Sequence, residues 1–180
     1  KRSIPFVIAE IGCNHMGDFE IAKRLIDAAV ASGCSAAKFQ KRNVKESLPH
    51  DIYIGPHPNP HNSYGATYGE HRENLELTNG QHRELHAYCN SKGIHYSCTP
   101  FDFTSADFLI NELKIEHLKI ASFHNNHFEL IDYICKNHPH QIHISLGMIS
   151  DDELDGLEEV IQKNKAMSRT VFYNCTSNYP

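Results

Sequence analysis

The chain has 180 residues, of which 40% are hydrophobic and 22% charged, and its formal net charge is −5. This length and composition are typical of one globular domain with its own hydrophobic core and exclude a disordered chain. The small acidic excess offers no basic surface to nucleic acid, and no apolar run approaches the roughly 18 residues that a membrane span needs. We therefore expect no nucleic-acid partner, no membrane partner and no signal peptide.

Six cysteines are scattered along the chain without a Cys-x-x-Cys pair, and several lie in apolar runs. This spacing favours buried, reduced thiols over a disulfide framework, which is the weaker alternative. We therefore predict a cytoplasmic protein.

Short apolar segments alternate with amphipathic segments of helical period. The apolar segments predict six strands, at residues 5–11, 35–40, 94–99, 116–122, 141–146 and 169–174. The amphipathic segments predict helices at residues 18–32, 78–92, 104–113, 127–137 and 150–164. Strands that alternate with helices form a parallel sheet that is covered on both faces.

The predicted helix ends carry capping residues. Thr78 and Ser150 each precede a Gln or Glu by three residues, which is the pattern of a capping box, and an Asp follows Thr104 at the same spacing. Gly33 and Gly93 stand where a left-handed residue ends a helix. These signals support the predicted alternation of strands and helices.

Two architectures have this alternation, an open doubly wound sheet and a closed (β/α)₈ barrel. The open sheet usually has a G-x-G-x-x-G loop after its first strand, whereas residues 10–17 hold two glycines at another spacing. In a barrel the functional side chains lie at the carboxyl ends of successive strands, where this chain has polar residues. We therefore predict an α/β fold of the (β/α)₈ TIM-barrel type, with about six of the eight units in this sequence.

Polar side chains end every predicted strand. They are Glu10 with Asn14 and His15, Lys38 with Gln40, Ser97 with Thr99, Lys119 with Ser122, Ser145 before Gly147, and Asn174 before Thr176. A lysine within an apolar strand is costly unless it is paired or solvated, and this chain has two. Two lysines and several hydroxyls suit a small anion with more than one charge, such as a phosphorylated carboxylic acid. Glu10 would accept a hydrogen bond from a hydroxyl or water; the alternative is a set of rim residues that satisfy one another.

An ordered set of motifs carries a family resemblance. The motifs are A-E-I-G at residues 9–12, N-H-x-G-D at 14–18, K-F-Q at 38–40, T-P-F-D at 99–102, K-I-A-S at 119–122, S-L-G-M at 145–148 and C-T-S-x-Y-P at 175–180. Their order and spacing resemble the sialic acid synthase family, which makes N-acetylneuraminate and related nonulosonates. The Pro-rich insertion at residues 56–60 is similar to the bacterial nonulosonate branch of that family.

The resemblance implies a barrel enzyme that condenses phosphoenolpyruvate with an acyclic acetamido-sugar aldehyde and releases phosphate. It places phosphoenolpyruvate on Lys38, Thr99, Lys119, Ser122 and Ser145. The implied catalytic residues are Glu10, Gln40, Lys38 and Lys119, and further substrate contacts are Asn14, His124, Asn125 and Tyr179. A divalent cation, Mn²⁺ or Mg²⁺, would polarise the aldehyde oxygen.

Two positions depart from the family pattern. Asn174 stands where members often have a metal-binding His, and its amide oxygen suits a hard cation such as Mg²⁺ better than a softer metal. His124 stands where an acidic residue commonly contacts the sugar. Either His124 reverses the polarity of that contact, or it is a neutral replacement.

Residues 41–77 are too long for an ordinary βα loop of about 2–6 residues. The segment is rich in Pro, His, Asn, Gly and Tyr, which favours an excursion over the active site, and Glu70 and Arg72 are its candidate substrate contacts. Its alternatives are a dimer contact and a disordered flap.

The resemblance also predicts the domain organisation. Residues 1–180 would be part of an N-terminal barrel domain, and two further βα units and an antifreeze-like C-terminal domain of the family are not in this sequence. The full-length protein would be a homodimer, and residues 1–180 alone would be inactive. Two other functions stay open: a Schiff-base aldolase or lyase with Lys119 or Lys38 as nucleophile, and a non-catalytic barrel scaffold.

Overall fold

The computed structural model describes residues 5–178 and shows an α/β fold with a six-stranded parallel sheet. The strands follow one another in chain order, β1-β2-β3-β4-β5-β6. The chain divides into two compact units, residues 5–96 and 97–178 of the described part. The predicted parallel α/β fold is therefore confirmed.

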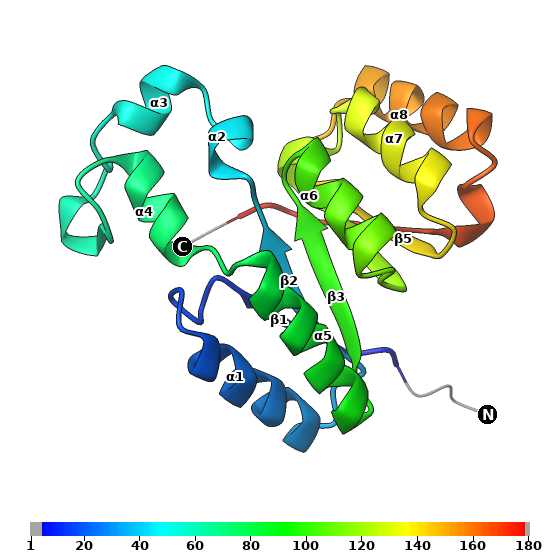
Figure 1. Cartoon of the computed structure of the whole chain (residues 1–180). Helices are drawn as coiled ribbons and strands as arrows, with labels where there is room; N and C mark the ends of the chain where they lie inside the picture. The colour runs from blue at the N-terminus through cyan, green and yellow to red at the C-terminus, as the bar shows by residue number, and fades with distance from the viewer. Residues whose placement is uncertain (1–4, 179–180) are drawn as a thin grey trace. The chain divides into compact units, whose positions relative to one another are not determined.

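The first unit begins with β1 (Ile8–Gly12) and β2 (Ala36–Lys41), which pair in parallel. The helices α1 (Phe19–Ala31) and α5 (Asn79–Lys92) lie side by side in this unit (Figure 1). Successive side chains of β2 point to opposite faces of the sheet. Ala37 and Phe39 are fully buried in the core, and Lys38 and Gln40 point to the other face.

The excursion at residues 41–77 is built mainly of short helices. These are α2 (Val44–Ser47), α3 (His50–Ile54), the 3₁₀ turn η1 (Pro60–Asn62) and α4 (Tyr68–Leu75), which Figure 1 shows in cyan and blue-green. Gly69 lets α3 and α4 pack closely, because a Cβ there would strike the ring of Tyr53. The segment is an ordered part of the first unit, so the interpretation as a disordered flap is wrong.

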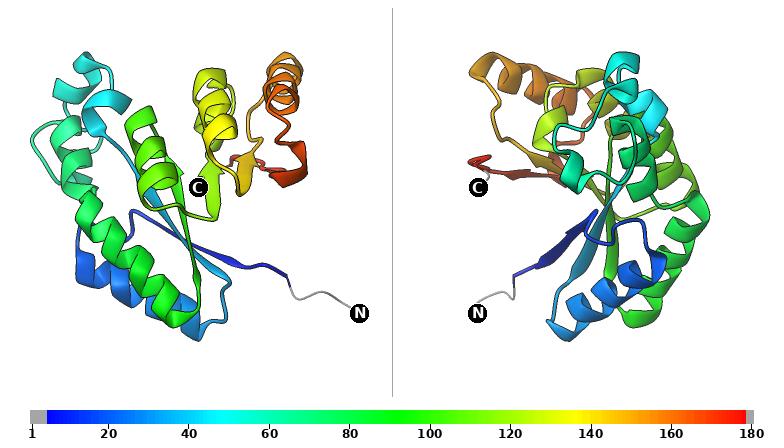
Figure 2. Two further views of the ribbon diagram at one scale, coloured as in Figure 1. Left: turned by 45° about the vertical axis from the view of Figure 1, so that its right-hand side comes forward. Right: turned by 90° about the vertical axis from the view of Figure 1, so that its left-hand side faces the viewer.

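The second unit takes up the rest of the chain after β3 (His95–Pro100), which begins in the first unit. Its strands are β4 (His117–Ile120), β5 (Gln141–Ser145) and β6 (Thr170–Tyr173), and its helices are α6 (Phe103–Asp107), η2 (Phe108–Glu112), η3 (Ser122–His124), α7 (Phe128–Asn137), α8 (Asp151–Lys163) and η4 (Met167–Arg169). Both views in Figure 2 show α7 and α8 next to each other. The core between helices and strands includes Leu118, Ile131, Ile142, Ile144 and Leu157.

The predicted helix ends are mostly confirmed. Thr78 and Ser150 form complete capping boxes, and Gly33 and Gly93 have positive φ of 73° and 71°. Thr104 is not a cap, however: Asp102 accepts the hydrogen bond of the Ser105 amide at 2.6 Å, and the predicted helix 104–113 changes into a π-helix at residue 108. A carboxylate two positions earlier competes better for the free amides than the hydroxyl does.

The strand ends differ from the sequence prediction by up to three residues. The predicted strand 116–122 ends at Ile120, because Ser122 already starts a 3₁₀ turn. The predicted strand 5–11 begins at Ile8. Among the described residues, none of the helices combines the length and apolar character that crossing a bilayer requires.

Candidate active site

The carboxyl ends of β1 and β2 place an ion pair in the first unit. Lys38 Nζ lies 2.7 Å from Glu10 Oε1, and the Lys38 side chain is 8% exposed whereas that of Glu10 is 62% exposed. The register of the two strands sets residues 10 and 38 directly opposite each other. The carboxylate therefore compensates a lysine that the strand buries, and it stays open to solvent on its other side.

Gln40 follows Lys38 on the same face of β2 and is held by side chains that the sequence analysis did not single out. Its Oε1 accepts hydrogen bonds from Arg42 Nη2 at 2.6 Å and from Cys13 Sγ at 3.3 Å. Arg42 in turn pairs with Glu76, with Nη1 3.0 Å from Oε1. Burial raises the pKa of the Glu76 carboxyl, and the charge of Arg42 opposes that rise.

The strand β4 of the second unit supplies the other lysine. Lys119 Nζ donates to Ser145 Oγ at 2.5 Å and to the Ile120 carbonyl at 2.6 Å, and it lies 5.5 Å from the centre of the Tyr173 ring. An ammonium group over an aromatic face gains further stabilisation in a partly buried site. This lysine is thus fixed in one place by β4, β5 and β6 together.

A hydroxyl cradle surrounds Gly147 in the loop after β5. A Cβ on Gly147 would clash with Ser177 Oγ and would lie 2.7 Å from Ser122 Oγ. Asn125 braces the loop, since its Nδ2 donates to the carbonyls of Ser145 and Gly147 at 3.2 and 3.0 Å. Two hydroxyls that approach bare backbone in this way suit the oxygens of a small anion.

The remaining predicted contacts of the site take different places. Thr99 is buried, with 2% of its surface exposed, near the end of β3. Asn14 is exposed, and its Nδ2 donates to the Ile11 carbonyl at 2.8 Å. His15 is buried and accepts from the Gly17 amide at 3.1 Å, and burial lowers its pKa. His15 is thus a neutral residue that holds the turn after β1.

His124 lies among aromatic rings of the second unit. Its ring centre is 5.4 Å from that of Phe101, 5.0 Å from that of Phe123 and 5.7 Å from that of His127. Two of these three rings, Phe101 and Phe123, are apolar. Both interpretations of His124 stay predictions.

Asn174 is exposed at the end of β6, and Tyr179 lies outside the described residues. As a cation ligand, Asn174 offers one amide oxygen, which is a hard donor. Mg²⁺ takes oxygen ligands of this kind and fills its other positions with water and substrate oxygens. The donor chemistry therefore fits a hard divalent cation, which would still need other ligands.

The excursion holds both of its candidate substrate contacts in local interactions. Arg72 donates to the Tyr68 hydroxyl through Nε at 3.0 Å and Nη2 at 2.7 Å. Glu70 accepts from the Ala66 amide at 2.8 Å. Both side chains therefore stabilise the fold of the excursion, and a substrate contact from either stays a prediction.

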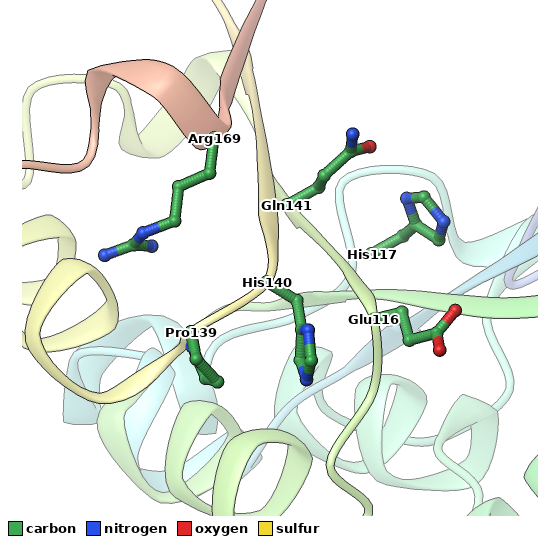
Figure 3. Close-up of a pocket in the computed structure, with 6 residues that line it drawn as sticks. All are labelled: Glu116, His117, Pro139, His140, Gln141 and Arg169. Carbon is green, nitrogen blue, oxygen red and sulfur yellow. The ribbon is translucent and has the colours of Figure 1, made fainter.

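A cavity of about 380 Å³ lies at the amino ends of β4, β5 and β6, away from the strand ends that carry the predicted site. Figure 3 shows the residues that line it, Glu116, His117, Pro139, His140, Gln141 and Arg169. The Arg169 guanidinium points away from His117 and Gln141 in this view and donates to the carbonyls of His138 and Cys135 at 2.7 and 2.6 Å. The arginine is therefore engaged in closing the end of α7.

Arg42, Glu76 and Ser177 lie beside the predicted site residues although the sequence patterns did not indicate them. A signal for Arg42 was present in the spacing of Lys38, Gln40 and Arg42, although Arg42 lies just after β2, which ends at Lys41. Nothing local indicated Glu76, which is 34 residues from Arg42 in the sequence.

Comparison with known proteins defines the class: a model of the NeuB family matches residues 25–180. N-acetylneuraminate-9-phosphate synthase of Homo sapiens is 36% identical over 176 residues, which are 97% of this chain and 47% of the human protein. N,N'-diacetyllegionaminic acid synthase of Legionella pneumophila is 33% identical over 178 residues, 97% of this chain and 49% of that protein. The chain belongs to the NeuB family and spans about half the length of these relatives.

Solved structures agree with this assignment. The N-acetylneuraminic acid synthetase of Leptospira borgpetersenii, in complex with citrate, aligns with a TM-score of 0.81 and 27% identity over 99% of this chain and 56% of that chain. The spore coat polysaccharide biosynthesis protein SpsE of Bacillus subtilis aligns with a TM-score of 0.75 and 26% identity over 100% of this chain and 46% of that chain. The resemblance to the sialic acid synthase family is thus confirmed.

Proposed function

We propose that the protein containing this chain condenses phosphoenolpyruvate with an N-acetylmannosamine-like amino-sugar aldehyde to give a sialic-acid-type nonulosonate and phosphate. The observation that carries this proposal is the fixed ammonium of Lys119 on Ser145, two residues before the hydroxyl cradle at Gly147. Relatives named as N-acetylneuraminate-9-phosphate and diacetyllegionaminic acid synthases support it.

The residues divide the chemistry between an anion site and a condensation site. Lys119 with the hydroxyls of Ser122 and Ser145 would bind phosphoenolpyruvate, together with Lys38 and Thr99. Carbon 3 of the enol attacks the aldehyde carbon, water adds to carbon 2, and phosphate leaves by cleavage of its bond to that carbon. Glu10, open to solvent beside Lys38, would orient the added water or the new hydroxyl.

A divalent cation, Mg²⁺ or Mn²⁺, would supply Lewis-acid polarisation of the aldehyde when bound. Asn174 would be one of its oxygen ligands in this chain, and the exposure of Asn174 leaves room for substrate and water ligands.

The proposed architecture of the full protein is a (β/α)₈ barrel, to which residues 1–180 contribute about six units. The excursion at residues 41–77 would lie over the active site, a C-terminal antifreeze-like domain would follow, and the protein would be a cytoplasmic homodimer. The alignment with about half of two longer chains, the synthetase of Leptospira borgpetersenii and SpsE of Bacillus subtilis, supports the proposal that the full protein is longer than this sequence.

Calorimetric titration with phosphoenolpyruvate in the presence of Mg²⁺ or Mn²⁺ tests the anion site. A phosphate-release assay over acetamido sugars, with and without a terminal phosphate, then tests the reaction and identifies the acceptor. We expect binding, and phosphate release that depends on one acceptor. A protein that does not bind phosphoenolpyruvate with either cation would support the scaffold alternative instead.

Borohydride trapping distinguishes the proposal from a Schiff-base aldolase. A nucleophilic amine must first lose its proton, whereas Lys38 is paired with a carboxylate and Lys119 donates to two oxygens. We expect no covalent adduct after borohydride treatment with pyruvate. A reduced adduct on Lys38 or Lys119 would contradict direct attack by the enol.

A further inference from the structure

We propose that Arg42, held by Glu76, orients the side-chain amide of Gln40 so that Gln40 donates a hydrogen bond to the aldehyde oxygen of the acceptor. Gln40 would then be a catalytic residue of defined polarity, and Arg42 and Glu76 its positioning residues. This role rests on the condensation proposed above.

The orientation of the Gln40 amide follows from its partners. A guanidinium group carries only donors, so the atom that Arg42 Nη2 meets at 2.6 Å must be the amide oxygen. Cys13 Sγ donates to the same oxygen from 3.3 Å. The opposite end of the amide is therefore Nε2, which has two hydrogens to donate.

The Gln40 amide packs against Gly12, which has no side chain. The backbone of Gly12 has a φ of 54°, and Gln40 Nε2 would lie 3.4 Å from a Cβ at that position. The amide nitrogen thus lies against bare backbone at the end of β1, two residues after Glu10. A donor at this point is next to the ion pair that the proposed reaction uses.

Glu76 holds Arg42 through both its side chain and its backbone. Its Oε1 binds Arg42 Nη1 and its Oε2 binds the Arg42 backbone amide, both at 3.0 Å. The two side chains are only 10% and 11% exposed. Lys41 Nζ also donates to the Leu77 carbonyl at 3.5 Å, so both ends of the excursion are tied together next to Gln40 in the sequence.

The chemistry needs a donor at the acceptor oxygen. When carbon 3 of the enol bonds to the aldehyde carbon, the carbon–oxygen π pair moves to oxygen, which takes the proton released by the water that adds to carbon 2. An N–H whose amide oxygen already accepts from a guanidinium is polarised and stabilises the charge that develops on that oxygen.

Two variants test the proposal against a matched control. Gln40→Glu keeps a partner for Arg42 and loses the donor, while Arg42→Met with Glu76→Gln frees the amide without leaving a buried carboxylate unpaired. Arg24→Met, on the exposed side of α1, is the control. We expect phosphoenolpyruvate affinity within about threefold of wild type in all three, while phosphate release falls about 100-fold in Gln40→Glu and at least about 10-fold in the double variant. A further variant, Arg42→Ala, tests the role of the guanidinium group itself. Added guanidinium ion should restore part of its rate of phosphate release, because the ion can occupy the place of the missing side chain.

Other outcomes would reject the proposal. A large loss of phosphoenolpyruvate binding in the double variant would make Arg42 an anion ligand, and unchanged phosphate release in Gln40→Glu would remove the donor role. If the wild-type protein itself neither binds phosphoenolpyruvate nor releases phosphate, the proposed function fails. NMR of the Gln40 side-chain amide then tests separately whether Arg42 orients it. Its proton resonances should shift in the double variant, and identical resonances would show that Arg42 does not orient this amide.

Discussion

At the scale of single residues, the site depends on two lysines within apolar strands. Lys38 is compensated by a carboxylate, whereas Lys119 meets a hydroxyl, a carbonyl and an aromatic face. We expect the ammonium of Lys119, held on the hydroxyl of Ser145, to be the main positive charge of the proposed anion site.

Lys119→Ala is expected to lower phosphoenolpyruvate affinity at least about 100-fold, because the charge that binds the anion is removed. The free energy of unfolding should stay within about 1 kcal/mol of wild type, since the lysine contributes charge and little core packing. Calorimetry and urea unfolding measure the two effects, with Lys163→Ala, an exposed position on α8, as the control. Equal affinity in Lys119→Ala and wild type would show that the anion binds elsewhere.

At the scale of elements, the loops after the strands make the site and the helix caps hold those loops. Ser150 caps α8 three residues after Gly147, and its capping box fixes where the loop after β5 must end. The excursion follows the same principle, because Arg42 near its start pairs with Glu76 near its end. Loop conformation is therefore set by contacts at the loop ends.

Gly147→Ala is expected to weaken anion binding as well as the packing of the loop after β5. The new methyl group would displace the hydroxyls of Ser122 and Ser177, and overpacking of this kind typically costs about 1–3 kcal/mol. Phosphoenolpyruvate affinity should fall at least tenfold, by about 1.4 kcal/mol or more. Gly80→Ala is the control, because its Cβ would meet only Thr78 Oγ1 at 3.8 Å and should stabilise α5. If Gly147→Ala bound phosphoenolpyruvate as tightly as wild type, the hydroxyl cradle around Gly147 would not be part of the anion site.

At the scale of the whole molecule, buried histidines connect the fold to pH. Burial lowers the pKa of His82 to about 3 and that of His138 to about 4, and both side chains are almost fully buried. In the unfolded chain each has a pKa near the ordinary value of about 6.5. Between these values the unfolded chain binds a proton that the folded protein does not.

The free energy of unfolding should therefore fall as the pH falls below about 6.5, and each of these histidines should account for a loss of about 2 kcal/mol at pH 5. Urea unfolding between pH 7.5 and 5 measures the slope. His138→Gln should show a shallower slope than wild type, with exposed His61→Gln as the control. A slope unchanged in His138→Gln would mean that His138 is protonated in the folded protein.

Sequence patterns alone determined the alternation of strands and helices, the two capping boxes, both left-handed glycines and the residues at the strand ends, since these depend on period, local hydrogen bonding and steric freedom. They also carried the family resemblance, because its motifs are short and contiguous. The tertiary structure decided what the strand-end residues touch: that Glu10 pairs with Lys38, that Ser145 receives Lys119, and that Glu76 reaches back across the excursion to Arg42. Such contacts join residues 26 to 34 positions apart, and they form only when parallel strands and a folded loop bring distant backbone together, which no local pattern encodes.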